Sequence, residues 1–226
     1  MVFTIPEVFT KDQVRQIRDI LANAPYEAQQ KTGTSEGQEY GLIKNNLQVP
    51  AGRPEVRPAA ELISRTLLNH GEFSAVSMPR KLRLLFNRYD PGMFYEAHID
   101  AALMPHGKGE IARNDMSFTV FLSEPEEYQG GDFVIDLPYG RQRIREPAGN
   151  VILYSADTLH GVETVEEGAR WAVVGWIESY IKDPRDRELH HDLTHLMQDI
   201  AALGDTGLKR RFAGVRERLL RRWIDT

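Results

Sequence analysis

The sequence predicts a mainly β fold with flanking helices around a jelly-roll core. Three observations support this fold class: short apolar strands between turn residues from position 81 onward, amphipathic helical patterns before them, and a leucine-rich helical segment after position 184. With 226 residues, of which 41% are hydrophobic and 27% charged, the chain can bury a full core and has an ordinary globular composition.

The composition also narrows the class of protein. No apolar run approaches the roughly 20 residues that a membrane span needs, and the first residues lack the basic start and apolar segment of a secretion signal. The chain has no cysteine, which excludes disulfides and thiolate chemistry. We therefore expect a cytoplasmic protein without membrane contact.

Helical patterns dominate the N-terminal region, which we assign to residues 1–78. Thr10 and Gln13 form a capping-box pattern, and apolar residues then recur at helical spacing, which predicts a helix over 11–23. A second helix is predicted from about residue 58 to 69. Residues 32–41, rich in Gly, Thr, Ser and Gln, are interpreted as a loop of this support region.

Seven strands are predicted in the next region, residues 79–180, with a loop at 101–115 that shows no periodicity. Strands of this length with turn signals between them indicate a sandwich or barrel of the jelly-roll type, the double-stranded β-helix of cupin-like proteins. The strands are expected at 82–89, 94–100, 116–123, 131–137, 141–146, 150–156 and 170–179.

The remaining residues, 181–226, predict a helical hairpin. Leucine and isoleucine recur at steps of four and three from Leu189 to Leu203, Gly204 and Gly207 interrupt the pattern, and a second helix follows from about 208 to 223. The hairpin caps the barrel or forms a homo-oligomer, and the pattern does not choose between these. Its basic residues are interpreted as a solvated helix face, so nucleic acid is not an expected partner.

Three residues of the jelly-roll region form a candidate metal site. His98 and Asp100 are separated by one residue in a predicted strand, so they are either two ligands on one face or a polar pair on a solvated edge. His160 comes 60 positions after Asp100, about the length that three or four intervening strands use. Two histidines and one carboxylate leave one side of a metal open, which suits non-haem Fe(II) oxygen chemistry.

Arg170 opens the last predicted strand, ten positions after His160. A guanidinium that enters an apolar core is costly unless it meets an anion, and its planar fork can bind a carboxylate through two hydrogen bonds. Together the four residues predict a metal beside a carboxylate clamp.

Several segments resemble one family of enzymes. FNRYDPGMFYEAHID, MSFTVFLSEPEEYQGGDFVI, PAGNVILYSADTLHGVETV and GARWAVVGWIES are similar to the Fe(II)- and 2-oxoglutarate-dependent dioxygenases, specifically the bacterial PKHD-type hydroxylases. KNNLQV (44–49) and IKDPRDRELHHDL extend the likeness to nearly the whole chain. The resemblance implies that His98, Asp100 and His160 bind Fe(II) and that Arg170 clamps the far carboxylate of 2-oxoglutarate.

The resemblance also implies the reaction. A PKHD-type hydroxylase would use dioxygen and 2-oxoglutarate to hydroxylate an unactivated carbon, with release of succinate and CO2 and with L-ascorbate as a further cofactor. The presence of Asp100 favours hydroxylation, since related halogenating enzymes lack this carboxylate. The implied substrate is an amino acid, a peptide or a small iron-related molecule.

Further residues are assigned from their positions on the predicted strands. The hydroxyl of Tyr89 either reaches the cosubstrate or is satisfied within the core. Ser117 and Thr119 share one face of their strand and would assist Arg170 if that face lines the pocket. Arg141, Arg143 and Arg145 form either a solvated outer face or a stripe that guides an anionic substrate. Asn45 and Asn46 match the family without a derived role.

Two other functions stay open: a cupin-like metal enzyme that does not use 2-oxoglutarate, and a non-catalytic jelly-roll binding or sensor protein. His191 and His195 offer a rival metal site, since their spacing serves zinc in some enzymes. Asp192 stands where a glutamate would be expected and no third ligand is evident, so these histidines are interpreted as polar positions beside the leucine pattern. His106 is interpreted as part of a lid over the substrate.

Overall fold

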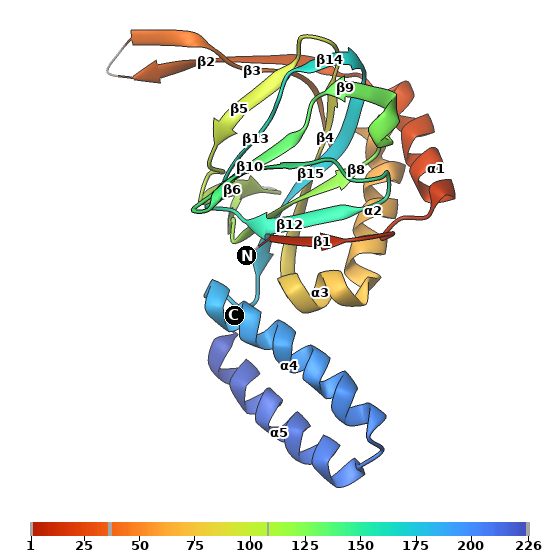
Figure 1. Cartoon of the computed structure of the whole chain (residues 1–226), viewed down its shortest axis with the longest axis vertical. Coiled ribbons are helices and arrows are strands. Elements are labelled where there is room, and N and C mark those ends of the chain that lie inside the picture. Colours follow the sequence, from red (N-terminus) through yellow and green to blue (C-terminus); the bar gives the residue numbers. More distant parts are fainter. Residues whose placement is uncertain (1, 36–37, 108, 225–226) are drawn as a thin grey trace.

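The computed structural model describes residues 2–35, 38–107 and 109–224. It consists of a large curled antiparallel sheet with the N-terminal helices on one side and a C-terminal helical hairpin that extends from the body (Figure 1). This architecture confirms the predicted fold class. The helices are α1 (Lys11–Ala22), α2 (Arg57–Asn69), α3 (Gly71–Ser77), α4 (Pro184–Ala202) and α5 (Thr206–Trp223).

The strands alternate in direction along the sheet in the order β1-β12-β8-β15-β4-β3-β5-β13-β10-β11, with β2 paired to β3. They are β1 (Val2–Ile5), β2 (Glu27–Ser35), β3 (Gln38–Pro50), β4 (Pro79–Tyr89), β5 (Phe94–His98), β6 (Leu103–His106), β7 (Glu110–Arg113), β8 (Met116–Phe121), β9 (Tyr128–Gly130), β10 (Phe133–Leu137), β11 (Gly140–Ile144), β12 (Val151–Ser155), β13 (Leu159–Val162), β14 (Val165–Gly168) and β15 (Arg170–Ser179).

Strand β3 joins the two halves of the sheet. Its last residues, Leu47–Pro50, pair with β4, whereas Lys44 and Asn45 pair with β5. The sheet can therefore turn back on itself, and β5, β13 and β10 face the longer half across an interior. Aromatic and aliphatic side chains from both halves meet there, among them Tyr89, Phe121, Phe133 and Tyr154.

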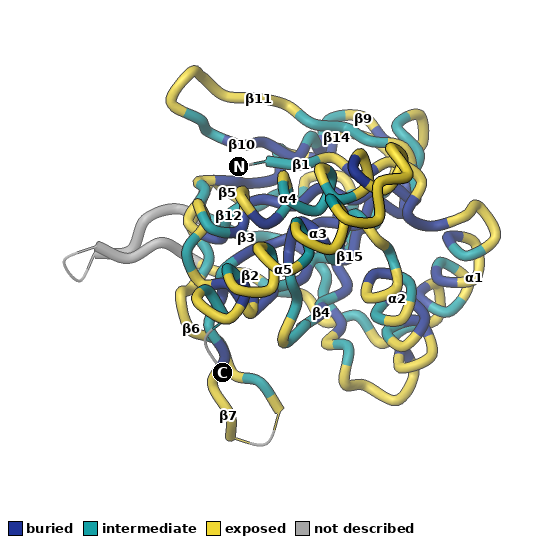
Figure 2. The backbone as a smooth tube through the Cα atoms, turned by 90° about the horizontal axis from the view of Figure 1, so that it is seen from below, coloured by how far each residue is buried: buried dark blue, intermediate teal, exposed yellow. Residues whose placement is uncertain are grey.

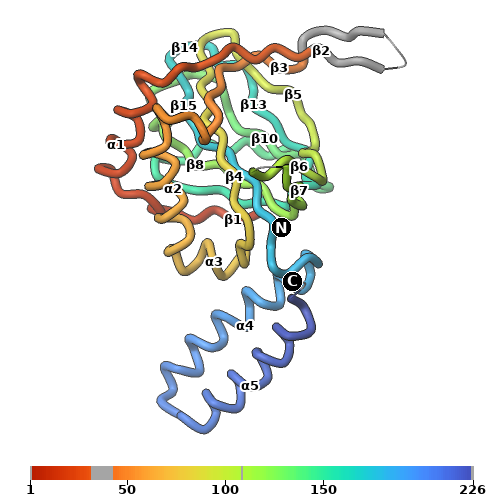
Figure 3. Tube along the Cα trace, turned by 180° about the vertical axis from the view of Figure 1, so that it is seen from behind, coloured from red at the N-terminus to blue at the C-terminus, as the bar shows by residue number. Residues whose placement is uncertain are grey.

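The larger core lies between the sheet and the N-terminal helices (Figure 3). Helix α1 begins at the predicted capping box, in which Thr10 Oγ1 accepts from the amide of Gln13 and the Gln13 side chain accepts from the amide of Thr10. Its apolar stripe of Val14, Ile17 and Leu21 is buried against the sheet. This layer holds the long strands rigid and leaves the opposite, curled side for the site.

Two predictions about loops were wrong. Residues 32–41 belong to the long hairpin of β2 and β3, except for residues 36–37, which lie outside the described part of the chain. The loop at 101–115 contains the hairpin of β6 and β7, with residue 108 outside the description. Half of the residues of β7 are exposed (Figure 2). Hairpins of this kind are held by backbone pairing and do not need apolar periodicity.

The C-terminal hairpin of α4 and α5 is confirmed and projects from the body (Figures 1 and 3). Arg187 is buried at its base and donates to the carbonyls of Ile181 and Lys182. The hairpin also packs against α3. Among the helices of the described residues, none is both long and apolar enough to cross a membrane.

Candidate metal centre

The three predicted ligands converge at the open end of the curled sheet. His98 ends β5 and lies directly opposite His160 of β13 in the strand register, while Asp100 lies two residues beyond the end of β5. The predicted strand 94–100 therefore extended two residues too far, and the strand that carries His160 was not predicted. Nε2 of His98 is 3.8 Å from Oδ1 of Asp100, and Nε2 of His160 is 3.7 Å from Oδ2.

Backbone carbonyls orient both imidazoles. Nδ1 of His98 lies 2.8 Å from the carbonyl oxygen of Glu96, and Nδ1 of His160 lies 2.9 Å from that of Thr158. A carbonyl can only accept, so in both rings the proton is on Nδ1 and the lone pair of Nε2 points to the common centre. This is the arrangement by which proteins set the tautomer of a metal-ligating histidine.

The protonation of His98 also suits a metal. Burial and, next, the neighbouring His160 lower the pKa of His98 to about 4, so this ring is neutral near pH 7. Neutral imidazole is the form that binds metals. Tyr95 stacks on the His98 ring with 3.7 Å between centroids and keeps it in place.

Ser117 positions the carboxylate ligand. Its Oγ donates a 2.7 Å hydrogen bond to Oδ2 of Asp100, and the serine is 1% exposed. Ser117 and Thr119 both face the interior, yet the hydroxyl of Ser117 contacts Asp100. We therefore assign Ser117 to orienting Asp100, and its part in 2-oxoglutarate binding stays a prediction.

Arg170 lies beside this centre with unsatisfied hydrogen-bonding groups. It is 2% exposed, and its Nε and Nη2 have no partner among the described residues. Its guanidinium carbon is 5.6 Å from the ring centroids of both Tyr89 and Phe121, which are apolar neighbours. Burial raises the pKa of Tyr89, although the charge of Arg170 opposes that rise. An uncompensated buried guanidinium is costly, so this position is suited to an anionic ligand.

One cavity of about 430 Å³ connects the two features. His98, Asp100 and His160 line it together with Tyr89, Thr119 and Arg170. Oγ1 of Thr119 is a third buried polar atom without a hydrogen-bond partner in the described part of the chain. The cavity thus combines a three-ligand centre with orphaned donors that a carboxylate would satisfy.

Sequence reasoning missed a polar ladder in the cavity wall. Lys44, Asn46 and Gln48 alternate along β3, and Asn87 Oδ1 on β4 accepts from Asn46 Nδ2 at 3.0 Å and from Gln48 Nε2 at 2.7 Å. Asn46 is fully buried. The signal was present in KNNLQV, where polar residues alternate with Leu47 and Val49, as in a strand with a polar inner face.

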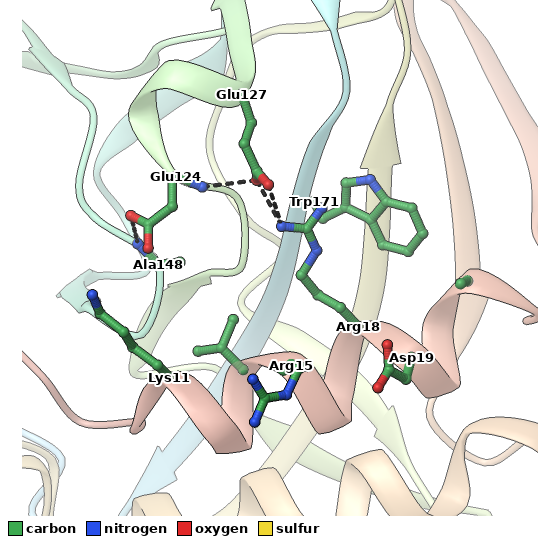
Figure 4. Close-up of a pocket in the computed structure, with 10 residues that line it drawn as sticks. Lys11, Arg15, Arg18, Asp19, Glu124, Glu127, Ala148 and Trp171 are labelled. Atoms are coloured by element: carbon green, nitrogen blue, oxygen red, sulfur yellow. Dashed lines mark hydrogen bonds and ion pairs between the residues drawn. The ribbon is translucent and has the colours of Figure 1, made fainter.

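A second hollow, of about 460 Å³, lies outside the sheet beside α1 (Figure 4). Figure 4 shows Arg18 reaching toward Glu127 next to Trp171. Nη1 of Arg18 is 2.7 Å from Oε1 of Glu127. Arg15 is paired with Asp12 at 2.6 Å. Among the described residues, two groups combine histidines with a carboxylate that could hold a metal ion, and neither lines this hollow. The hollow is therefore not a second candidate for the metal centre.

The predicted arginine stripe, whose Arg141 and Arg143 lie on β11 and whose Arg145 follows its end, is not free to guide an anion. Arg141 pairs with Asp136, Arg143 with Glu163 and Arg145 with Asp132, at 2.6–2.9 Å. Its charge is therefore compensated on the protein itself, as expected for a solvated face. His106 lies on β6 and is not among the residues that line the cavity, although Met104 of the same strand is.

Known proteins resemble this chain in sequence. The family model described as the 2OG-Fe(II) oxygenase superfamily matches residues 84–178. A PKHD-type hydroxylase of Paracoccus denitrificans is 34% identical, and one of Hyphomonas neptunium is 36% identical, each over the full length of both chains.

Solved structures share the fold at low identity. An oxidoreductase of the 2OG-Fe(II) oxygenase family from Burkholderia pseudomallei has a TM-score of 0.55 at 19% identity, covering 78% of this chain and 85% of that one. HygX from Streptomyces hygroscopicus, crystallised with nickel and 2-oxoglutarate, has a TM-score of 0.53 at 15% identity, with 80% and 84% covered.

Proposed function

The chain belongs to the PKHD-type hydroxylases of the 2OG-Fe(II) oxygenase superfamily, and from this membership we propose that His98, Asp100 and His160 hold its Fe(II) while Arg170 binds the distal carboxylate of 2-oxoglutarate. The protein is accordingly an Fe(II)- and 2-oxoglutarate-dependent oxygenase. L-Ascorbate is commonly an additional cofactor in this family. The alternatives of a cupin-like enzyme without 2-oxoglutarate and of a non-catalytic sensor are set aside.

One observation carries the assignment of residues. Arg170 is buried in the same cavity as the three candidate ligands, and two of its nitrogens have no partner within the part of the chain that the structure describes. Leaving donors of a charged group unsatisfied costs stability, and a carboxylate that enters the cavity removes this cost. A metal site alone would not require such a residue, whereas a keto acid that reaches from the metal to Arg170 does.

The residues of the chain have defined tasks in this scheme. When bound, Fe(II) supplies the activation of dioxygen that is coupled to conversion of 2-oxoglutarate into succinate and CO2. The Nδ1 hydrogen bonds of His98 and His160 and the Oγ hydrogen bond of Ser117 hold the three donors in place. Tyr89, Phe121, Phe133 and Tyr154 enclose the interior and limit access of water.

The charge of the cavity supports a substrate that carries a carboxylate. Lys31, Lys44 and Arg83 line it beside the metal ligands, and none forms an ion pair with a described carboxylate. Lys31 and Lys44 are directly opposed across β2 and β3, where like charges repel unless an anion lies between them. Burial, and next the charge of Lys31, lower the pKa of Lys44. An amino acid or a peptide with an acidic group fits this wall.

Binding of iron and 2-oxoglutarate tests the site directly. Anaerobic titration of the wild-type protein with Fe(II) and 2-oxoglutarate should give the weak visible charge-transfer band of a chelated keto acid. Asp100→Ala should abolish the band, and Arg170→Gln should raise the Kd for the keto acid by about 10–100-fold, because a charge-assisted hydrogen bond is worth about 1.5–3 kcal/mol. An unchanged band in both variants would contradict the assignment.

The substrate class is tested by succinate release. A panel of amino acids and short peptides, each with a free carboxylate or as the neutral amide, should favour the acids. Lys44→Gln should raise the KM for an accepted acid about tenfold and leave the KM for the keto acid cosubstrate unchanged. Equal turnover of acids and amides would refute the carboxylate preference.

Location and assembly stay predictions. We propose that the enzyme is cytoplasmic. We also propose that it self-associates through α4 and the residue that follows it, because Leu189, Leu196 and Leu203 recur every seven residues and are 51%, 45% and 71% exposed. Light scattering of the wild type and of Leu196→Glu would test this, since a dimer formed there should dissociate in the variant.

A further inference from the structure

A second group of metal-ligating side chains lies where the C-terminal hairpin meets the body. Glu72 of α3 and His191 and His195 of α4, here called the hairpin cluster, each offer one donor atom within 4.8 Å of the others. Nε2 of His191 is 2.7 Å from Oε1 of Glu72, and Nε2 of His195 is 3.2 Å from Oε2. The two Nε2 atoms are 3.0 Å apart.

Protons alone cannot make these three contacts favourable. If both Nε2 atoms carry a proton, each can donate to Glu72, but then two N–H groups face each other at 3.0 Å. If either Nε2 is unprotonated, its lone pair faces a carboxylate oxygen, and two acceptors are in contact. With Glu72 ionised, every assignment therefore leaves at least one pair of like groups together, whereas a cation between the atoms would accept all three lone pairs.

We propose that the hairpin cluster is a second metal site, which binds a divalent transition-metal ion of the zinc type and fastens α4 to α3. Two imidazoles and one carboxylate are a common zinc donor set, with water as the fourth ligand. Solvent can supply that water, because the side chains of His191, Glu72 and His195 are 16%, 34% and 44% exposed.

The spacing of the donors fits such an ion after a small adjustment. With bonds of about 2.0–2.1 Å, two ligands of a tetrahedral zinc lie about 3.3 Å apart. The observed separations of 2.7, 3.0 and 3.2 Å are slightly shorter, and small rotations of exposed side chains would open them. The ring of Phe3 packs edge-on against His191 with 5.0 Å between centroids, so the least exposed ligand is already held in place.

The charge of Glu72 supports the same conclusion. The ordinary pKa of a glutamate side chain is about 4.3. Glu72 is therefore a carboxylate near neutral pH, as a metal ligand must be. This site is independent of the iron centre, since the two share no residue and lie on different elements.

Zinc stoichiometry of the full chain tests the proposal without any activity assay. After removal of metals by a chelator, Zn²⁺ is titrated in competition with a chromophoric chelator, and bound zinc is counted by atomic emission. The wild type should bind two equivalents, because zinc also occupies sites built for Fe(II). His98→Ala should keep only the hairpin equivalent. Glu72→Gln and His195→Ala should weaken that equivalent about 100-fold and keep the other.

Controls separate a built site from loose binding. His106→Ala, which removes a histidine outside both clusters, should still bind two equivalents. Zinc should also slow hydrogen exchange in α3 and α4 of the His98→Ala protein but not of His195→Ala. If His191→Ala fails to fold, the more exposed His195 still provides the test. The proposal is overturned if His98→Ala binds no zinc, or if the second equivalent survives in both Glu72→Gln and His195→Ala.

Discussion

At the scale of single residues, Ser117 contacts the proposed iron centre through Asp100. Its 2.7 Å hydrogen bond to Oδ2 fixes the direction of a carboxylate that follows the end of a strand and has no ladder pairing of its own. Ser117→Ala should lower metal affinity about 10–100-fold, as the loss of such supporting contacts typically does. Metal titration followed by chelator competition would measure the change.

A matched control lies on the same strand. Thr119→Val keeps the side-chain shape and removes a hydroxyl that has no partner in the described part of the chain. Metal affinity should stay at the wild-type value in this variant. Equal loss in both variants would mean that the strand, and not the Ser117 hydroxyl, supports the centre.

Sequence patterns predicted residues whose chemistry leaves few alternatives. His98, Asp100, His160 and Arg170 were predicted because their types, order and spacing together suit a metal beside a carboxylate clamp. Asn46 could not be assigned, because a buried amide has meaning only through its partner, here Asn87 on a neighbouring strand. Glu72 could not be assigned either, since it lies 119 residues from His191 in the sequence.

At the scale of elements, the pairing of β5 with β13 places the two histidines side by side. Gly161 lets the strands approach: a Cβ there would lie 2.7 Å from the carbonyl oxygen of Tyr95 and 3.1 Å from the amide nitrogen of Ala97. Gly161→Ala should push the strands apart, at a cost of about 1–3 kcal/mol, and separate His98 from His160. The expected result is weaker metal binding in the same titration.

Gly52→Ala provides the comparison for that experiment. Nothing lies within 4 Å of a Cβ at Gly52, and its φ is not in the left-handed region. Stability and metal affinity should both match the wild type. Wild-type affinity in Gly161→Ala as well would show that the close approach of β5 and β13 is not required for the centre.

Helices and strands were predicted correctly where one buried face gives the sequence a regular apolar spacing. They were missed where no face of the element is buried in this way. Helix α1 and strand β4 have apolar residues at the spacing of their core-facing sides. The β2–β3 and β6–β7 hairpins are held by backbone pairing in polar or exposed segments, so their composition resembled loops. The expected boundaries between the three regions, at residues 78 and 180, stay predictions. Strand β3 of the first region pairs with β4 and β5 of the second, so these two regions share one sheet.

At the scale of the whole molecule, His190 links the hairpin to the body. It is 1% exposed, its Nδ1–H donates to the carbonyl of Ala75 on α3, and its Nε2 accepts from Arg216 of α5. Burial lowers the pKa of His190, and the charges of Arg216 and His191 add to this. Its neutral form is therefore the one that the folded state stabilises.

The pH dependence of stability follows from that direction. Below about pH 6.5 the unfolded chain takes up a proton on His190 before the folded chain does, so stability present above this pH is lost as the pH falls. The free energy of unfolding of the metal-free protein should decrease from pH 7.5 to pH 5.5, with His190 contributing at most about 1.4 kcal/mol per pH unit. Urea unfolding at several pH values measures it.

His190→Gln removes the titration and keeps a neutral polar side chain at the same position. Its unfolding free energy should be lower than that of the wild type at pH 7.5 but should change less on acidification. An identical pH slope in the two proteins would assign the effect to other groups.

The sequence by itself determined the β-rich fold class, the C-terminal helical hairpin and the set of residues proposed to bind iron and 2-oxoglutarate. The fold class and the hairpin follow from the local spacing of apolar residues. The proposed binding residues follow from their chemical types, because a buried charged group such as Arg170 costs stability unless it binds a partner. Only the tertiary structure decided that Nε and Nη2 of Arg170 have no partner among the described residues, that Arg141 and Arg143 of β11 are paired with carboxylates, and that Glu72 completes a cluster with His191 and His195. Each of these depends on which distant residue lies opposite, and strand pairing and helix packing determine that.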